Sequence, residues 1–229
     1  DGQHKNKAVG RIEDSTINAG GDVIVRGDLT QVATTEGYAG SLAVGISIGG
    51  AVAAAGAEST TKFSSHSDAA IIDSSVTAAG DVIVQSTSSS LVDGADAVGA
   101  SLSGGVVAVS IGVAMVVIDI ENKVEARIES SGTDTVTAGD DVVVKADVTR
   151  AEVRDLEAVM ASVSIGGVAL AGGGLGLDVE VDNDVDALIS GANLTVNATD
   201  DVSVIAEEDA DLRATAVATS LAVGLSVGG

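Results

Sequence analysis

The chain lacks several residue types on which common classes of protein depend. Its 229 residues include no cysteine and no tryptophan, and they include only one phenylalanine, Phe63, and one tyrosine, Tyr38. The absence of cysteine excludes disulfides, thiolate metal sites and cysteine nucleophiles. A core must then be built from Val, Ile, Leu, Ala and Gly, without the large area that aromatic side chains bury. This composition favours thin, closely packed layers.

Positive charge is also scarce. The chain carries 11 Lys and Arg residues against 34 Asp and Glu residues, which gives a formal net charge of −23. A surface this acidic repels nucleic-acid phosphates and anionic membranes, so we expect no nucleic-acid partner. The apolar fraction of 45% argues against simple disorder, which requires low hydrophobicity together with high charge. The charge indicates a self-repelling, soluble surface, with divalent-cation binding as the alternative.

An internal repeat of about 60 residues organises the chain. An acidic turn followed by a β-branched run begins at Asp22, Asp81, Asp141 and Asp201, which lie 59, 60 and 60 positions apart. A fixed period indicates stacked units that bury a common core only by covering one another. We therefore predict one repeat array over residues 1–229 and expect it to be a window from a longer chain. The predicted units are 22–80, 81–140 and 141–200, with partial units at 1–21 and 201–229.

Three uncharged stretches, 37–57, 97–118 and 158–177, are long enough to be membrane-helix candidates. Their flanks are mostly acidic, however, and carry no Lys/Arg asymmetry that would orient a span. Large and small residues also alternate along them with a period of two, which is typical of β-strands. We predict strands here and no membrane-spanning segment.

Charged strands in the second half of each unit show the clearest alternation. Between residues 175 and 189, aliphatic residues occupy one face and carboxylates the other. The preceding unit alternates in the same way from Val116 to Ile128. This pattern predicts a strand with a dry face and a charged, wet face.

The uncharged stretches have no wet face, so we predict that both of their faces are buried. Large aliphatic residues occupy one face: Leu42, Val44, Ile46 and Ile48, with counterparts around Leu102, Val163, Ile165 and Leu221. The other face carries Ala43, Gly45, Ser47 and Gly49, which would allow a second backbone to approach closely. On this hypothesis Gly45→Leu should damage the protein far more than Asp184→Leu. Glycine pairs at 49–50, 104–105 and 166–167 predict bulges or corners.

One polar position recurs on the dry face, where Asn6, Asn122 and Asn183 fall, and the same alignment places His66 there. Because a buried amide must be hydrogen-bonded, we predict a ladder of Asn side chains at this position. A ligand role for His66 is the alternative, although the only other histidine is His4.

No sequence pattern supports catalysis, and we assign no catalytic, cofactor-binding or metal-binding residue. The run from Asp182 to Asp186 begins like a calcium loop but has Ala187 and Asn193 where an EF-hand needs Gly and Glu. Paired acids at 140–141 and 200–201 could hold Ca²⁺ with turn carbonyls, which stays open as an alternative. The expected protein is therefore not an enzyme and carries no cofactor.

The order of the blocks resembles the repeats of giant bacterial surface proteins, the filamentous-haemagglutinin-like and leukotoxin-type adhesins. The similarity rests on TAGDDVVV, then SLAVG or SIGG, then N-x-V-x-A-x-I, and it covers essentially the whole chain. It implies an all-β rod exported to the bacterial cell surface and a role in adhesion or scaffolding.

We predict an all-β, elongated repetitive array, a β-solenoid, with tandem β-sandwich modules as the alternative fold. The spacing leaves open whether a unit forms one coil of about 60 residues, two of about 30 or three of about 20. The predicted function is a structural segment of an extracellular bacterial adhesin or stalk. The alternative is a subunit of a self-assembling extracellular filament or sheath. Expected partners are adjacent repeats, other copies of the chain, and a host or neighbouring-cell surface.

Overall fold

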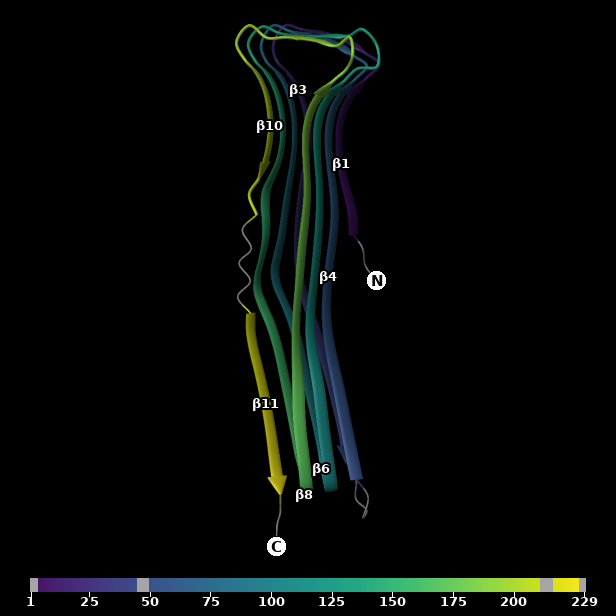
Figure 1. The fold of residues 1–229 in the computed structure, drawn as a ribbon, viewed down its shortest axis with the longest axis vertical. Helices are drawn as coiled ribbons and strands as arrows, with labels where there is room; N and C mark the ends of the chain where they lie inside the picture. The colour runs from purple at the N-terminus through teal and green to yellow at the C-terminus, as the bar shows by residue number, and fades with distance from the viewer. Residues whose placement is uncertain (1–3, 45–49, 211–215, 227–229) are drawn as a thin grey trace.

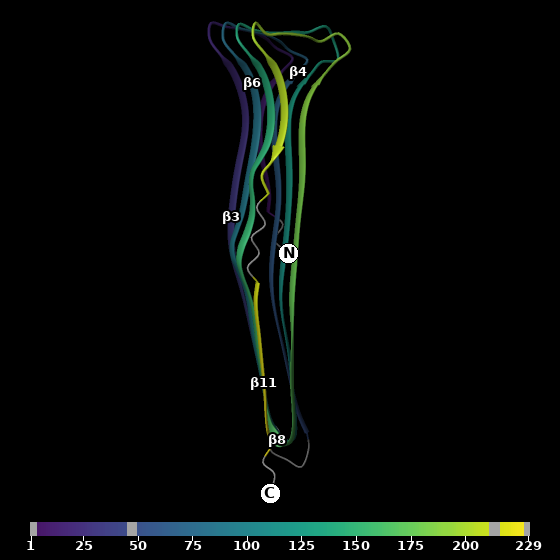
Figure 2. The ribbon, with the colours of Figure 1, turned by 60° about the vertical axis from the view of Figure 1, so that its left-hand side comes forward.

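The chain folds as an all-β solenoid in which successive 60-residue units stack in parallel (Figures 1 and 2). The computed structural model describes residues 4–44, 50–210 and 216–226, and the side chains of 6–38 and 50–210. Its strands are β1 (His4–Glu13), β2 (Thr16–Ala19), β3 (Val23–Val44), β4 (Gly50–Ile72), β5 (Ser75–Ala78), β6 (Val82–Glu129), β7 (Thr135–Ala138), β8 (Val142–Ser190), β9 (Thr195–Asn197), β10 (Val202–Glu208) and β11 (Ala216–Ser226).

Each coil is a long, narrow loop with two walls and one short side. The first wall runs from a wide end to a narrow end and comprises β3, residues 82–104 of β6, residues 142–166 of β8, β10 and β11. The second wall returns to the wide end and comprises β1, β4, residues 107–129 of β6 and residues 168–190 of β8. Short strands β2, β5, β7 and β9 form a separate parallel sheet across the wide end (Figure 1).

One unit therefore makes one coil, which answers the question that the spacing left open. Val23 pairs with Val82, and Val82 pairs with Val142, so equivalent residues of successive units lie directly beside one another. The pairing is parallel throughout the described strands, whereas β-sandwich modules are antiparallel. Each coil advances the stack by about 4.8 Å, but a wall of 22 residues is about 75 Å long. The longest dimension of this chain consequently runs along the strands.

The widest part of each coil holds a conventional aliphatic core. Val82, Val124 and Val142 are fully buried there, and Ile71 and Ile128 pack in the same cluster. The alternating residues 116–128 place their aliphatic side chains inside, as predicted. In the following coil Val181, Val185 and Ile189 pack partly buried against this cluster, which confirms the dry face at these positions. Leu177 of the same predicted face is 36% exposed.

Toward the narrow end the walls converge, and the interior is filled by small residues. The hydroxyls of Ser101 and Ser110, from opposite walls of one coil, lie 2.7 Å apart. Met160 fills the remaining space, because a Cβ added to Gly112 would lie 1.4 Å from the Met160 methyl carbon. The predicted close approach to a second backbone is thus made by the opposite wall of the same coil.

The prediction that the large aliphatic face is also buried is wrong within this chain. Leu102 and Ile165 point outward and retain 40% and 43% of their exposure, and Val163 is only half-buried. Because the walls are too close to accept branched side chains, the small residues take the inside and the large ones are left outside. The side chains of Leu42, Val44, Ile46, Ile48 and Leu221, and of Ala43, Gly45, Ser47 and Gly49, lie outside the described part of the chain.

Two of the glycine pairs do mark corners. Gly104 and Gly105 lie at the narrow-end turn of β6 and pair with Ile165 and Gly166 of β8, so the ladder continues around the turn. The remaining irregularities were not evident in the sequence. They are register shifts near Thr35 and Ser89 on the first wall.

Candidate functional site

The strongest polar feature of the interior is a ladder of Asn and Ser side chains around Asn122. This residue is 1% exposed. Its Nδ2 donates to Oδ1 of Asn183 in the next coil at 2.7 Å. Its Oδ1 accepts from the hydroxyls of Ser65 at 2.6 Å and Ser90 at 2.7 Å. The predicted Asn ladder is confirmed for Asn122 and Asn183, and its role is to satisfy buried amides between coils.

The sequence alignment misplaced the second member of this ladder by one residue. Ser65, not His66, stands in register with Asn6 on one side and Asn122 on the other. His66 pairs with Lys7 and Lys123 and points to the outer face of the second wall. The error arose because the block HSDAAII was aligned by its first polar residue. A Ser can replace Asn here because both supply a hydrogen-bonding side chain on the inner face.

A second ladder explains the repeated Asp at the start of each unit. Oδ1 of Asp22 accepts the backbone N–H of Asp81 at 3.0 Å, and Oδ1 of Asp81 accepts that of Asp141 at 3.0 Å. Oδ1 of Asp141 in turn accepts the N–H of Asp201 at 2.8 Å. Each carboxylate therefore satisfies a turn amide of the following coil. The spacing predicted a turn, but only the stacking reveals this bond between coils.

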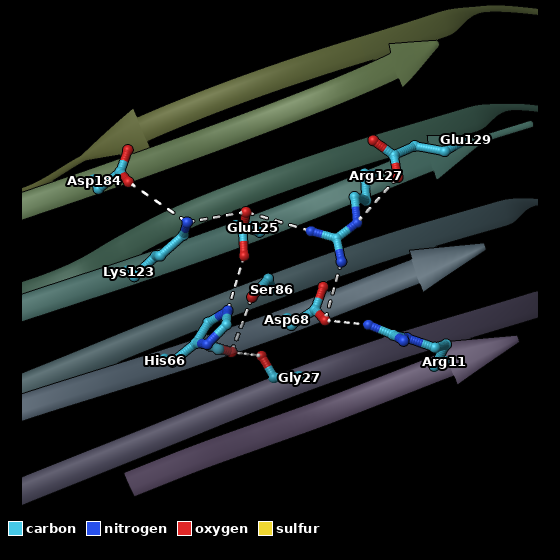
Figure 3. A network of polar contacts seen from close by, with 11 residues as sticks. Arg11, Gly27, His66, Asp68, Ser86, Lys123, Glu125, Arg127, Glu129 and Asp184 are labelled. Carbon is cyan, nitrogen blue, oxygen red and sulfur yellow. Dashed lines mark hydrogen bonds and ion pairs between the residues drawn. The ribbon is translucent and has the colours of Figure 1, made fainter. Parts of the chain in front are cut away.

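The outer face of the second wall carries the densest group of charges (Figure 3). Asp68 is only 1% exposed. Its Oδ2 forms salt bridges with Nη2 of Arg11 at 2.9 Å and with Nη2 of Arg127 at 3.3 Å, and these arginines belong to the coils on either side. Glu125 lies 2.8 Å from Nε2 of His66 and 3.3 Å from Nζ of Lys123. The network thus ties three successive coils together across their outer surface.

The pKa shifts in this network follow from those contacts. Burial opposes the charged form of Glu125, yet hydrogen bonds from His66 and Lys123 hold its pKa below the usual range. The hydrogen bond to Asp68 raises the pKa of Arg11. Both shifts favour the charged pairs, as expected for groups that link coils.

The adjacent hydroxyl of Ser67 is not available to His66 as a nucleophile. The neighbouring Ser67 points to the inner face, where its hydroxyl donates to the carbonyl of Gly27 at 2.5 Å and accepts from Ser86 at 2.9 Å. Adjacent residues of a strand face opposite sides, so Ser67 cannot approach the imidazole. The cavity of about 300 Å³ beside His66, at the beginning of β1, is lined by polar and charged side chains. The arrangement around His66 is that of a hydrogen bond between coils, from the imidazole to the Glu125 carboxylate.

The candidate calcium ligands are dispersed along strands and turns. Asp182, Asp184 and Asp186 alternate along β8 with Asn183 and Val185, and Asp184 lies 3.9 Å from Nζ of Lys123. Asp141 already accepts a backbone N–H. Among the residues with described positions, no group of three or more His, Asp or Glu side chains is arranged to hold a metal ion. Calcium binding at 140–141 and 200–201 stays an open alternative.

Comparison with known proteins adds no relative: no protein-family model, curated protein or solved structure matches the chain. The described residues also contain no helix of the length and hydropathy needed to cross a membrane. The features of the chain that bear on its function are therefore the stacking of the coils and the surfaces that they present.

Proposed function

We propose that the chain is a structural, non-catalytic repeat segment of an extracellular bacterial adhesin or stalk. The observation that carries this proposal is the exact equivalence of unit and coil, by which Val23, Val82 and Val142 stack in one ladder. A unit that meets identical neighbours on both sides can be added any number of times, because each coil interacts only with the next. Its immediate partners are the adjacent repeats.

The hydrogen-bond ladders support the same role. Asp22, Asp81 and Asp141 each bond to the following coil, and Asn122 bonds to Asn183 in the same way. The charged network around Asp68 and Glu125 links coils on the outside. These polar groups contribute to cohesion between coils, which supports a structural role. The acidic surface suits a protein exposed to solvent and without a nucleic-acid partner.

The shape of a coil favours the second candidate, a subunit of an extracellular filament or sheath. A unit of about 60 residues extends the stack by about 4.8 Å while each wall measures about 75 Å. A stack of such coils is broad along the strands and gains little length per unit. It therefore covers area efficiently, whereas a long stalk would require very many units. Other copies of the chain would then be partners alongside a host or neighbouring-cell surface.

Immunogold electron microscopy of the cells that make the protein, with antibodies against residues 1–229, tests the proposal. We expect the gold particles to lie outside the cell, on an extended structure. Discrete projections would support a stalk, and a continuous layer or regular polymer would support the sheath. Label confined to the cytoplasm would contradict both candidates.

A further inference from the structure

The narrow end carries an uncharged apolar surface on both walls. We call this surface the apolar band and define it as the outer surface of residues 37–38, 50–57, 97–118 and 158–177. Its large side chains include Leu102, Val106, Ile111, Val113, Val168 and Leu170, which are between 40% and 64% exposed. Such a surface is unusual on a soluble protein and marks an interaction site.

A rim of acidic residues bounds the band on the first wall. Glu36 stands in register with Asp96, and Asp96 with Glu157, so three carboxylates lie side by side across the coils. On the second wall of the first coil, the boundary is Glu58. The two boundaries of that coil are level, because a Cβ added to Gly37 would lie 2.6 Å from the Glu58 carbonyl oxygen.

On the first wall, the depth of the band is close to the thickness of the hydrocarbon core of a bilayer. Residues 97–104, from the rim to the turn, number eight and span about 26 Å at about 3.3 Å per residue. The hydrocarbon core is about 30 Å thick, so an edge of this depth enters it without crossing it. Tyr38, 70% exposed, lies beside the rim with its hydroxyl 3.1 Å from Glu36. A tyrosine at such a boundary suits the interface between lipid and water.

Within the band of the central coil, the backbone ladder and the inward hydroxyls supply internal hydrogen bonds, as a hydrocarbon environment requires. β6 pairs with β8 through its narrow-end turn, from Ser103 to Val107. The interior hydroxyls bond to one another across and along the coils, as Ser103 does with Ser164 at 3.0 Å. The outward positions therefore present aliphatic side chains while polar side chains stay inside.

The band fits lipid better than it fits a second copy of the chain. A copy docked on one wall would bury roughly 400 Å² of band over three coils, about half of the ~800 Å² per partner of a stable interface. It would also leave the other wall exposed. Lipid covers both walls and the turn together, without requiring a complementary shape.

We propose that the narrow end inserts edge-first into the hydrocarbon layer of an electrically neutral lipid bilayer, with Glu36, Asp96 and Glu157 at the headgroups. The acidic rim disfavours anionic lipids, because like charges would face each other at the interface. The inference goes beyond the structural role proposed above, and it stands whether or not the chain belongs to an adhesin.

Single-tryptophan variants test this directly, because the chain contains no tryptophan. Leu102→Trp places the reporter in the band, and Leu188→Trp places it at a similarly exposed position, 44%, on the charged part of the second wall. With phosphatidylcholine vesicles, the emission of Trp at 102 should shift to shorter wavelength and be quenched by brominated acyl chains. Emission from position 188 should change little. Phosphatidylglycerol vesicles should bind more weakly at low salt.

Charge substitutions complete the test. Val113→Glu should reduce the vesicle-bound fraction about tenfold or more, because a carboxylate in hydrocarbon is costly, whereas Leu188→Glu should leave it unchanged. Circular dichroism and thermal melting identify variants that fail to fold, and Leu102→Glu offers a second exposed site. Absence of vesicle binding by the folded parent chain would overturn the proposal. So would an emission shift at position 102 that occurs without lipid and follows chain concentration, which would assign the band to self-association.

Discussion

Asn122 donates a hydrogen bond to Asn183 at 2.7 Å, and these two residues occupy the same position in successive coils. The bond compensates for hydrogen bonds to water that Asn122 loses on burial. Because it forms only when the two coils are aligned, the buried amide is fully hydrogen-bonded only in the correct register. A one-residue slip would turn Asn122 outward and break the ladder. Polar interior residues in this solenoid therefore help to specify register as well as to stabilise it.

Replacing Asn122 with alanine should destabilise the protein by about 2–4 kcal/mol, because Ser65, Ser90 and Asn183 would lose buried partners. Urea denaturation followed by circular dichroism measures the change. The exposed Asn193 provides the matched control, and Asn193→Ala should change stability by less than about 0.5 kcal/mol. Equal effects of the two substitutions would contradict the ladder.

Asp81→Ala should cost about 1 kcal/mol, because its carboxylate accepts the backbone N–H of Asp141 in the adjacent turn. Asp81→Asn should retain most of this stability, since the amide oxygen remains an acceptor. The neighbouring acid of the next turn, Asp140, serves as a control, and Asp140→Ala should be nearly neutral. Thermal melting of the three variants compares them. If Asp81→Asn is strongly destabilised, the negative charge of the carboxylate is required and a neutral acceptor oxygen is not sufficient.

Gly112→Leu should destabilise the protein by about 2 kcal/mol or more, because the new side chain would occupy the volume of Met160. Gly174→Leu should be tolerated, since a Cβ there would lie 3.9 Å from its nearest neighbour, a methyl group of Val113. The double variant Gly112→Leu/Met160→Ala should recover part of the loss. If Gly112→Leu alone melts at the parent temperature, the walls are not in close contact at this level.

Acid should weaken the outer network through Glu125. The pKa of Glu125 is lowered in the folded protein despite burial, because His66 and Lys123 donate hydrogen bonds to its carboxylate. A lowered pKa contributes stability above the unfolded pKa, and that contribution is lost as the pH falls through the folded pKa. Glu125→Gln should therefore reduce stability at pH 7 and flatten its decline below about pH 4.5. Denaturation curves across pH 7 to pH 3 check both effects, with Glu121→Gln as the exposed comparison.

Removal of one complete unit should leave a folded protein. Deleting residues 82–141 joins Asp81 to Val142, which restores an Asp–Val junction and brings Val23 into register with Val142. Because repeat stability is a sum of unit and neighbour terms, the shortened chain should melt cooperatively at a lower temperature. Deleting residues 82–111 removes half a coil and should abolish the strand signal in circular dichroism. Comparable folding of both deletions would argue against one coil per unit.

The sequence alone determined the period, the strands and the dry face of the charged segments. Residues such as Val116 and Ile128 alternate with charged neighbours, and since a charge is costly to bury, the inward face follows directly. The repeated Asp22, Asp81 and Asp141 likewise predicted equivalent turns. Their bonds to the following coil required the stack, because partners 59 and 60 residues apart carry no local signal.

Tertiary structure decided the length of the coil and the orientation of the uncharged strands. Neither face of these strands carries charge, so solvation did not distinguish the inside from the outside. The distance between the walls made the choice. Around Ser101 and Ser110 the walls approach too closely for branched side chains, so small residues fill the interior and Leu102 remains outside. The tertiary structure also identified Ser65 as a member of the inner ladder. The register between coils places Ser65 beside Asn122, and its hydroxyl can make the hydrogen bond that this position requires.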